Sequence, residues 1–600
     1  MKKYIFAICS AVLLVSCKGM LDRFPQDKLS PETFLATETE MQTYTNALYP
    51  MFPSGFFSGG QSDAVTGREL DAEIRGGRTI NSGDSGWNWT YLRRINTFLE
   101  YCGNCKDEEI RDQYIALVRF FRAWFYFEKI KKFGDVPWYD HTLGSDDDDL
   151  YKPRDSRDYV MQRMIEDIDF AIEKLPSAHS DYRVTKWTAL ALKSRFCLFE
   201  GTFRKYHAGD VFLQTLPADA LPYSYYLEQA ADAADKFIAG SGYSIYSSEG
   251  EDASYIGLFT KYNISEGTNK EVILARDYSL EFDVTHSANA DYTSATLARR
   301  GITRKIIASY LMRDGSRFTD REGWETMSFK EEVQNRDPRL AQSIRTPGYC
   351  RLGTETLFGP NLEHCVTGYS PIKYFMGPED DHESYCDLIL FRAGEVYLNF
   401  AEAKAELGTI TQADINRSIK PLRDRVGMPN LMMTTANANP DPFLTDAKWG
   451  GFSNPILLAD PNKGLILEIR RERTIELLGE GFRYYDIIRW AEGHCFESPL
   501  LGMYFPGEGS YDLDGDEVPD VTLYSGGSAP EGHARATFKI GSEILLSEGT
   551  SGCIDFHKNS RTGWKWDDGK DYLYPIPIED RTLTQGALTQ NPGWNDGLSF

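Results

Sequence analysis

Apolar residues recur at helical spacing along much of the chain. The clearest case is residues 109–132, where large apolar side chains fall on one face of a helix with 3.6 residues per turn. The stripe consists of Ile110, Tyr114, Leu117, Phe121, Trp124 and Phe125. Gly134 and Pro137 follow it, and such residues typically end a helix. Further helices are predicted at residues 32–48, 158–175, 185–200, 225–239, 388–407, 415–426, 464–478 and 482–490.

Small residues lie at close spacing on several of these predicted helices. They include Ala189, Ala191, Ala230, Ala233, Ala234, Ala401 and Ala405. Small side chains let neighbouring helices approach closely, as in the helix pairs of a tetratricopeptide-like solenoid. No clean 34-residue period is visible, so any repeats are degenerate. Long stretches rich in Gly, Ser, Asn and aromatic residues separate the helices, at about 50–90, 240–300, 313–385, 427–463 and 495–570.

The N-terminus has the pattern of a bacterial export signal. Lys2 and Lys3 precede an apolar stretch, residues 4–15, that is too short to span a bilayer. Leu14-Val15-Ser16-Cys17 resembles a lipobox, in which the cysteine is lipidated and becomes the new N-terminus. We therefore expect residues 1–16 to be a lipoprotein signal peptide and Cys17 to carry the lipid anchor. The alternative is an ordinary signal peptide with a chance cysteine.

The charge of the chain narrows the class of ligand. Lys and Arg number 65 against 89 Asp and Glu, a net charge of −24, and loss of Lys2 and Lys3 makes it −26. Such a chain repels phosphate backbones, so we expect no nucleic-acid partner. Aromatic residues make up 13 % of the sequence, which suits neutral, ring-shaped ligands.

The sequence holds none of the common catalytic motifs. HExxH, G-x-S-x-G, P-loop and G-x-G-x-x-G patterns are all missing. A glycosidase needs only two suitably placed carboxylates, so the enzyme alternative stays open at this stage. A group of charged residues on predicted helices is interpreted as an ion-paired network between packed helices, rather than an acid/base site. The group is Arg392, Glu395, Glu402, Arg470, Glu472, Arg473 and Glu476.

Two acidic segments invite a metal interpretation. Asp512, Asp514, Asp516 and Asp520 alternate around Gly515, a pattern that directs carboxylates toward one point and predicts a structural calcium ion. A solvated acidic turn is the alternative. The contiguous run Asp146 to Asp149 has no turn residue inside it, and neighbouring carboxylates point in alternate directions, so we interpret it as a solvated loop. We expect no catalytic cofactor.

The cysteines are expected to be structural. Cys102 and Cys105 form a lone CxxC that ends a helical stretch, without the second ligand pair of a zinc site. An exported protein can form disulfides, and Cys350, Cys365 and Cys386 lie in loop-rich sequence where pairing is most expected.

A series of motifs, in order from end to end, resembles the SusD/RagB family of surface nutrient-binding lipoproteins of the Bacteroidota. They are the lipobox with the following LDRFPQDKLSPETF, WNWTYLRRINTFLE, RFFRAWFYFEKIKKFGDVP, RVTKWTALALKSRFCLFEGT, NRDPRL, FRAGEVYLNFAEAKAELG, LRDRVGMP, ILEIRRERTIELLGEGFRYYDIIRW and YLYPIP followed by LTQNPGW.

The resemblance implies a mainly α fold. Tetratricopeptide-like helix pairs form a solenoid scaffold, with a loop-rich variable subdomain containing little β. The resemblance also implies a division of the chain into an N-terminal helical region, 17–312, and a C-terminal region, 313–600, with helices at 388–490 and the variable loop-rich subdomain.

The resemblance also implies a role and partners. The protein would be lipid-anchored in the outer membrane, face the cell exterior, and deliver oligo- or polysaccharide to a SusC-like TonB-dependent transporter. A peptide ligand is the alternative within the same family. A binding role, and not catalysis, is expected; a glycoside hydrolase is the less favoured alternative.

Aromatic residues are the predicted ligand contacts. Trp87 and Trp89 stand just before a helix, where they would form a stacking platform for sugar rings; packing in the core is the alternative. By region, the family resemblance adds Tyr292 and Trp324 in the central loops.

Overall fold

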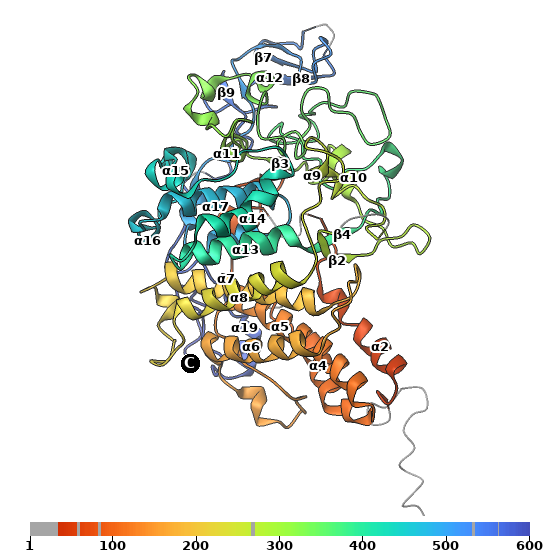
Figure 1. Cartoon of the computed structure of the whole chain (residues 1–600). Coiled ribbons are helices and arrows are strands. Elements are labelled where there is room, and N and C mark those ends of the chain that lie inside the picture. The colour runs from red at the N-terminus through yellow and green to blue at the C-terminus, as the bar shows by residue number, and fades with distance from the viewer. Residues whose placement is uncertain (1–33, 57–60, 82–85, 266–269, 531–533, 562) are drawn as a thin grey trace, which may run out of the picture.

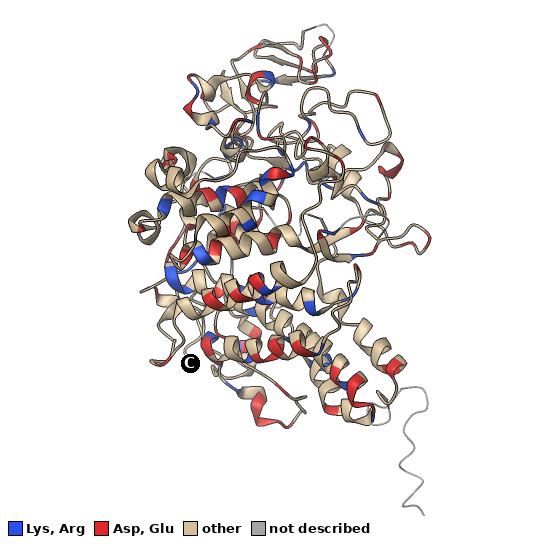
Figure 2. Cartoon of the chain, viewed as in Figure 1, with Lys and Arg blue, Asp and Glu red and all other residues tan. Residues whose placement is uncertain are grey.

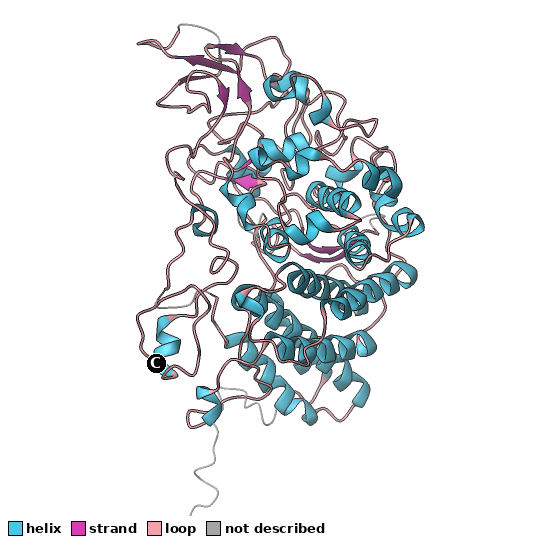
Figure 3. Ribbon diagram, turned by 90° about the vertical axis from the view of Figure 1, so that its left-hand side faces the viewer, coloured by secondary structure: helices cyan, strands magenta, loops and turns pink. Residues whose placement is uncertain are grey.

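The computed structural model describes residues 34–56, 61–81, 86–265, 270–530, 534–561 and 563–600. Stacked helices form one part of the molecule, and loops with small sheets form the other (Figures 1 and 3). The mainly α fold with little β is thereby confirmed. Cys17 and the export signal lie outside the described residues, as do the first two residues of the helix predicted at 32–48. The described part of that segment is helical only from Glu38 onward.

Long helices pack side by side in the stack, each against its neighbours in space. They are α2 (Glu38–Asn46), α4 (Thr90–Tyr101), α5 (Glu108–Phe133), α6 (Arg157–Lys174), α7 (Lys186–Tyr206), α8 (Tyr223–Gly240), α13 (Ala393–Glu406), α14 (Gln412–Asp424), α17 (Lys463–Glu476) and α18 (Arg483–Arg489). Shorter helices are α3 (Ala72–Arg75), α9 (Ser254–Gly257), α10 (Ala288–Thr293), α11 (Arg304–Ser309), α12 (Phe329–Glu332), α15 (Met433–Ala438), α16 (Pro455–Ala459) and α19 (Ile578–Leu583).

Helix α5 shows how local sequence sets an element. The Asp107 side chain accepts hydrogen bonds from the Glu109 and Ile110 amides, both at 3.1 Å, and so caps the first turn. The helix ends at Gly134, whose φ of +70° suits glycine. Its predicted apolar stripe is largely buried in the main core, which the stacked helices share.

Two further predicted helices have ends that differ clearly from the prediction. Helix α7 does not stop at Gly201 but continues to Tyr206. A Cβ at Gly201 would lie 2.7 Å from Cγ of Leu227 on α8, so this glycine permits close helix packing and does not end the helix. The predicted helix at 388–407 begins as strand β4 (Leu388–Arg392), because pairing with β2 (Val272–Arg276) supplies its backbone partners.

The strands form four small sheets. Antiparallel pairs are β1 (Val65–Thr66) with β3 (Gly301–Ile302), β2 with β4, and β5 (Tyr504–Phe505) with β9 (Gly552–Cys553). In the fourth, β7 (Val521–Tyr524) pairs antiparallel with β6 (Gly509–Tyr511) and parallel with β8 (Ala536–Lys539). A second apolar core lies under these sheets and loops. Because β2 and β4 pair, the parts before and after residue 312 share one sheet.

The predicted charge network between helices is present. Arg392 pairs with Glu476 at 2.8 Å and with Glu480 at 2.7 Å, and all three side chains are almost fully buried. Arg473 lies 2.9 Å from Asp486, and Glu402 binds Arg489. Burial alone would raise the pKa of Glu402, but Arg489 and Arg473 lower it to about 2. Basic and acidic positions accordingly lie close together along the stacked helices (Figure 2).

The described cysteines are all free, so the predicted pairing among Cys350, Cys365 and Cys386 is wrong. Cys365 and Cys386 are buried singly in the packed interior and act as small apolar residues there. None of the helices in the described ranges has the length and apolar character of a membrane span.

Candidate ligand cleft

A cleft of about 800 Å³ opens beside helix α4, and Trp87 and Trp89 both line it. Its other walls come from the segment 137–151 and from α19 with the residues that follow (α4 and α19 are labelled in Figure 1). The cleft therefore joins the N-terminal quarter of the chain to its C-terminal end. The two tryptophans predicted as a stacking platform thus line one cleft, and their contact with a ligand stays a prediction.

The two tryptophans have different surroundings. Trp87 is only 5 % exposed and packs edge-on against Phe133, with ring centroids 4.9 Å apart. Trp89 is half-buried, and Trp87 supports it edge-on at 5.3 Å. Tyr139 meets the Trp89 ring at 5.6 Å from the other wall. Trp89 is thus the more accessible of the two rings, and Trp87 belongs mainly to the core beneath it.

Buried polar side chains hold the walls in place. Lys129 of α5 donates to the carbonyls of Gly86 and Asn88, which fixes the turn that carries both tryptophans. Asn96 of α4 is 1 % exposed, and its Nδ2 donates to the Tyr139 carbonyl at 3.1 Å and the His141 carbonyl at 2.8 Å. These bonds tie the 137–151 wall to α4 and preorganise the cleft.

The wall 137–151 is attached to α4 at two further points. Arg93 donates to the Leu143 carbonyl at 2.9 Å. Glu100 accepts from the Thr142 amide at 2.6 Å. Both attachments use side chains of α4, and Arg93 also lines the cleft, so the position of the wall is tied to the helix.

The exposed lining combines aromatic and aliphatic surface with a few polar groups. Tyr151 is 55 % exposed and Leu583 is 71 % exposed, on opposite walls. Burial, followed by the carboxylates of Asp149 and nearby aspartates, raises the pKa of Tyr139 to about 12, so its hydroxyl stays protonated. Among the described residues, the buried Oδ1 of Asn96 has no hydrogen-bond partner. The cleft thus combines ring faces with hydroxyl and amide groups, and within the described part no lysine lines it.

Tyr292 and Trp324 do not line this cleft, and their predicted placement beside Trp87 and Trp89 is wrong. Tyr292 on α10 is 3 % exposed, packs against Phe56 and Phe375, and donates to the Lys373 carbonyl at 3.0 Å. Helices α10 and α4 lie far apart in Figure 1. Trp324 is partly buried and packs against the main core, with its ring centroid 5.1 Å from that of Trp449. Both rings pack against neighbours away from the cleft, and nothing in the local sequence distinguishes such a ring from one that lines a cleft.

The predicted calcium loop converges in part. Oxygens of Asp512, Asp514 and Asp520 lie within 4.8 Å of one another, but Asp516 is not in this group. Arg535 pairs with Asp514 at 2.9 Å and with both Asp516 and Asp520 at 3.0 Å. Lys330 pairs with Asp512 at 3.0 Å. The protein's own cations thus neutralise the loop, and calcium binding stays a prediction.

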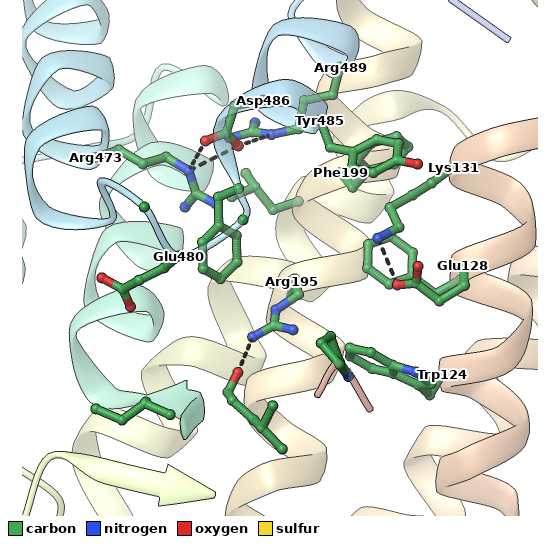
Figure 4. Close-up of a pocket in the computed structure, with 18 of the residues that line it drawn as sticks. Trp124, Glu128, Lys131, Arg195, Phe199, Arg473, Glu480, Tyr485, Asp486 and Arg489 are labelled. Atoms are coloured by element: carbon green, nitrogen blue, oxygen red, sulfur yellow. Dashed lines mark hydrogen bonds and ion pairs between the residues drawn. The ribbon is translucent and has the colours of Figure 1, made fainter. Parts of the chain in front are cut away.

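A second cavity, of about 170 Å³, lies between α5, α7 and α18 and is drawn in Figure 4. Trp124, Phe199 and Tyr485 line it together with several charged side chains. Lys131 pairs with Glu128 at 2.7 Å, and Arg473 and Arg489 both bind Asp486. Arg195 donates to Glu395 twice at 2.7 Å and to the Leu390 carbonyl at 3.1 Å.

These pairs assign the second cavity to the scaffold. Burial lowers the pKa of Lys131, but Glu128 at hydrogen-bond distance partly offsets this shift. The cationic groups in Figure 4 are engaged with carboxylates or a carbonyl, so none is offered alone to a ligand. The 800 Å³ cleft is therefore the stronger candidate for an oligomeric ligand.

Sequence reasoning missed the rest of the cleft. Tyr139 and Tyr151 belong to no motif, Asn96 lies in a family motif but gives no sign of a role in the cleft, and Leu583 lies at the far end of the chain. The one local signal was the density of aromatic residues after Pro137.

Comparison with known protein families identifies the family of this chain. The SusD family matches residues 270–594, and a family described as "Starch-binding associating with outer membrane" matches residues 79–198. The chain belongs to the SusD family.

Similar proteins agree with this assignment. SusD-like protein P38 of Formosa agariphila is 23 % identical over 523 residues, covering 83 % of this chain and 92 % of that protein. A SusD-like protein of Bacteroides fragilis has 21 % identity and a TM-score of 0.65, over 95 % of this chain and 100 % of the other. A second structure, described as a SusD-like carbohydrate-binding protein of the same species, also gives 21 % and 0.65, over 93 % and 99 %. At this identity the structures show a shared fold.

Proposed function

We propose that this SusD-family protein captures neutral oligo- or polysaccharides in the 800 Å³ cleft beside α4. The observation that supports the proposal is the half-buried Trp89 ring at the lining of a preformed cleft that also presents Tyr139 and Tyr151. Sugar rings stack their C–H faces on such side chains, and polar neighbours bind the hydroxyls. The role is binding and not catalysis.

We propose a location and a partner as well, on the basis of family membership. The protein is anchored in the outer membrane through lipid on Cys17, faces the cell exterior, and passes its ligand to a SusC-like TonB-dependent transporter. The family description "associating with outer membrane" supports the location. The net charge of −24 also argues against a polyanionic ligand and leaves neutral glycans favoured.

A binding screen tests the ligand class. The protein lacking residues 1–17 is applied to an array of neutral glycans, and hits are measured by calorimetry. We expect at least one oligosaccharide series to bind, with Tyr151→Ala weakening it and the control Tyr223→Ala leaving it unchanged. Tyr223 has similar exposure, 41 % against 55 %, but lies on α8 outside the cleft lining. Binding only to peptides, or release of shortened sugar products, would contradict the proposal.

A further inference from the structure

The acidic run Asp146 to Asp149 does more than face solvent. Asp147 and Asp149 are two positions apart, and one oxygen of each lies with a ring nitrogen of His141 in a group whose atoms are all within 4.8 Å. The 3₁₀ helix Asp148–Tyr151 begins inside the run and brings the two side chains to one side. His141 itself lines the ligand cleft, so the group lies at the edge of that cleft.

The distances at His141 are longer than those of hydrogen bonds; they fit an ion pair with a protonated imidazole and equally the spacing of two ligands on one metal ion. Its Nε2 lies 3.5 Å from Asp147 Oδ2 and 3.7 Å from Asp149 Oδ2. An N–H···O hydrogen bond brings its heavy atoms to about 2.9–3.0 Å. Two ligands bound tetrahedrally to one zinc ion, each at about 2.1 Å from the metal, lie about 3.4 Å apart.

The other ring nitrogen completes a familiar arrangement. Nδ1 of His141 lies 3.1 Å from Asp140 Oδ1. When that nitrogen donates to the carboxylate, Nε2 carries a lone pair directed toward the oxygens of Asp147 and Asp149. Metal-binding histidines are commonly oriented in this way by an outer carboxylate.

Two other clusters of acidic residues serve as comparisons, because other side chains of the protein already occupy their hydrogen-bonding groups. His494 has Glu497 at 2.9 Å on one nitrogen and Asp568 at 3.0 Å on the other, so both nitrogens are in hydrogen bonds. The Asp512 cluster has Arg535 and Lys330 as partners. In contrast, among the described residues no lysine or arginine pairs with Asp140, Asp147 or Asp149.

We propose that His141, Asp147 and Asp149 bind a divalent transition metal of the zinc class at the edge of the cleft. One imidazole nitrogen with two carboxylate oxygens suits Zn²⁺ or Co²⁺ better than Ca²⁺, which prefers oxygen ligands alone. The bound ion joins the end of the 137–141 segment to the helical turn that carries Leu150 and Tyr151. It thereby stiffens the wall opposite α19.

Metal titration tests the site without any glycan, so its outcome is independent of the proposed function. The protein lacking residues 1–17, with a histidine-free tag and stripped by chelator, is titrated with ZnCl₂ by calorimetry, and with Co²⁺ by visible absorption. We expect one site per chain. Asp147→Asn with Asp149→Asn, and separately His141→Gln, should weaken Zn²⁺ binding at least tenfold. Asparagine keeps an oxygen for the cap that Asp147 supplies to the Asp149 amide.

The same run provides a matched control. Asp146→Asn with Asp148→Asn removes the same charge from neighbouring positions outside the group and should leave Zn²⁺ affinity within threefold. Melting of each metal-free variant verifies that it is folded. The proposal is overturned if no Zn²⁺ binds, if the Asp147/Asp149 variant binds normally, if the control loses equal affinity, or if Ca²⁺ binds and Zn²⁺ does not.

Discussion

Trp87 and Trp89 stand two residues apart, and the structure gives them separable roles. Trp89 offers a half-exposed ring, and its truncation should remove stacking of roughly 1–3 kcal/mol, by analogy with base stacking on aromatics. We therefore expect Trp89→Ala to lower affinity for the bound oligosaccharide by one to two orders of magnitude with a near-native melt. Calorimetry and thermal denaturation on the same preparation measure both effects.

Trp87→Ala is the matched comparison. Its ring is 5 % exposed against Phe133, so truncation should leave a cavity and lower the free energy of unfolding by about 3–5 kcal/mol. Urea denaturation measures this change. Equal loss of stability in both variants, with normal binding by the folded fraction, would place both rings in the core.

At the scale of elements, the turn between β6 and β7 tests the calcium prediction. Arg535 pairs with three of its four aspartates, so calcium has to displace a guanidinium. We expect Arg535→Gln to enlarge the rise in melting temperature produced by millimolar calcium over chelator, since binding to the folded state alone stabilises it. Asp514→Ala with Asp516→Ala in the same background should abolish the rise. If neither calcium nor chelator changes the melting temperature of any variant, the loop is an acidic turn whose carboxylates are paired with Arg535.

At the scale of the whole molecule, the proposed anchor is lipid on Cys17 of the lipobox, which lies outside the described residues. If this proposal is right, the anchor is a covalent lipid and not a part of the folded helices. We expect Cys17→Ala to release a folded, ligand-binding protein from the outer-membrane fraction, measured by fractionation in cells that lack the transporter. Retention of that variant in the membrane would overturn the lipobox interpretation.

Local sequence was sufficient for most elements. The stripe of α5, its Asp107 cap and the glycine at its end involve residues within a few turns of one another, so the pattern alone located this helix. The pattern gave the wrong result at Gly201 and at residues 388–392, because contacts with residues distant in the sequence determine the structure there. At Gly201 the absence of a Cβ makes room for Leu227, and residues 388–392 form the strand β4 that pairs with β2. The paired charges of Arg392 and Glu476 were also foreseen, since carboxylates and guanidinium groups on packed helices require one another when buried.

For the candidate site, the sequence determined less, and the tertiary structure more, than for the helices. By itself, the sequence determined the family and the helical scaffold, because these rest on motifs and local periodicity, and it pointed to the Trp87–Trp89 turn as a candidate site. Only the tertiary structure decided that Trp89 is more exposed than Trp87, that Tyr292 is buried, and that Leu583 from the C-terminal end lines the same cleft. It also brought His141 to Asp147 and Asp149 and placed Arg535 among the calcium candidates. Whether a side chain is exposed, and whether several side chains meet at one point, depends on how segments distant in the sequence pack together. A local sequence pattern does not contain that information.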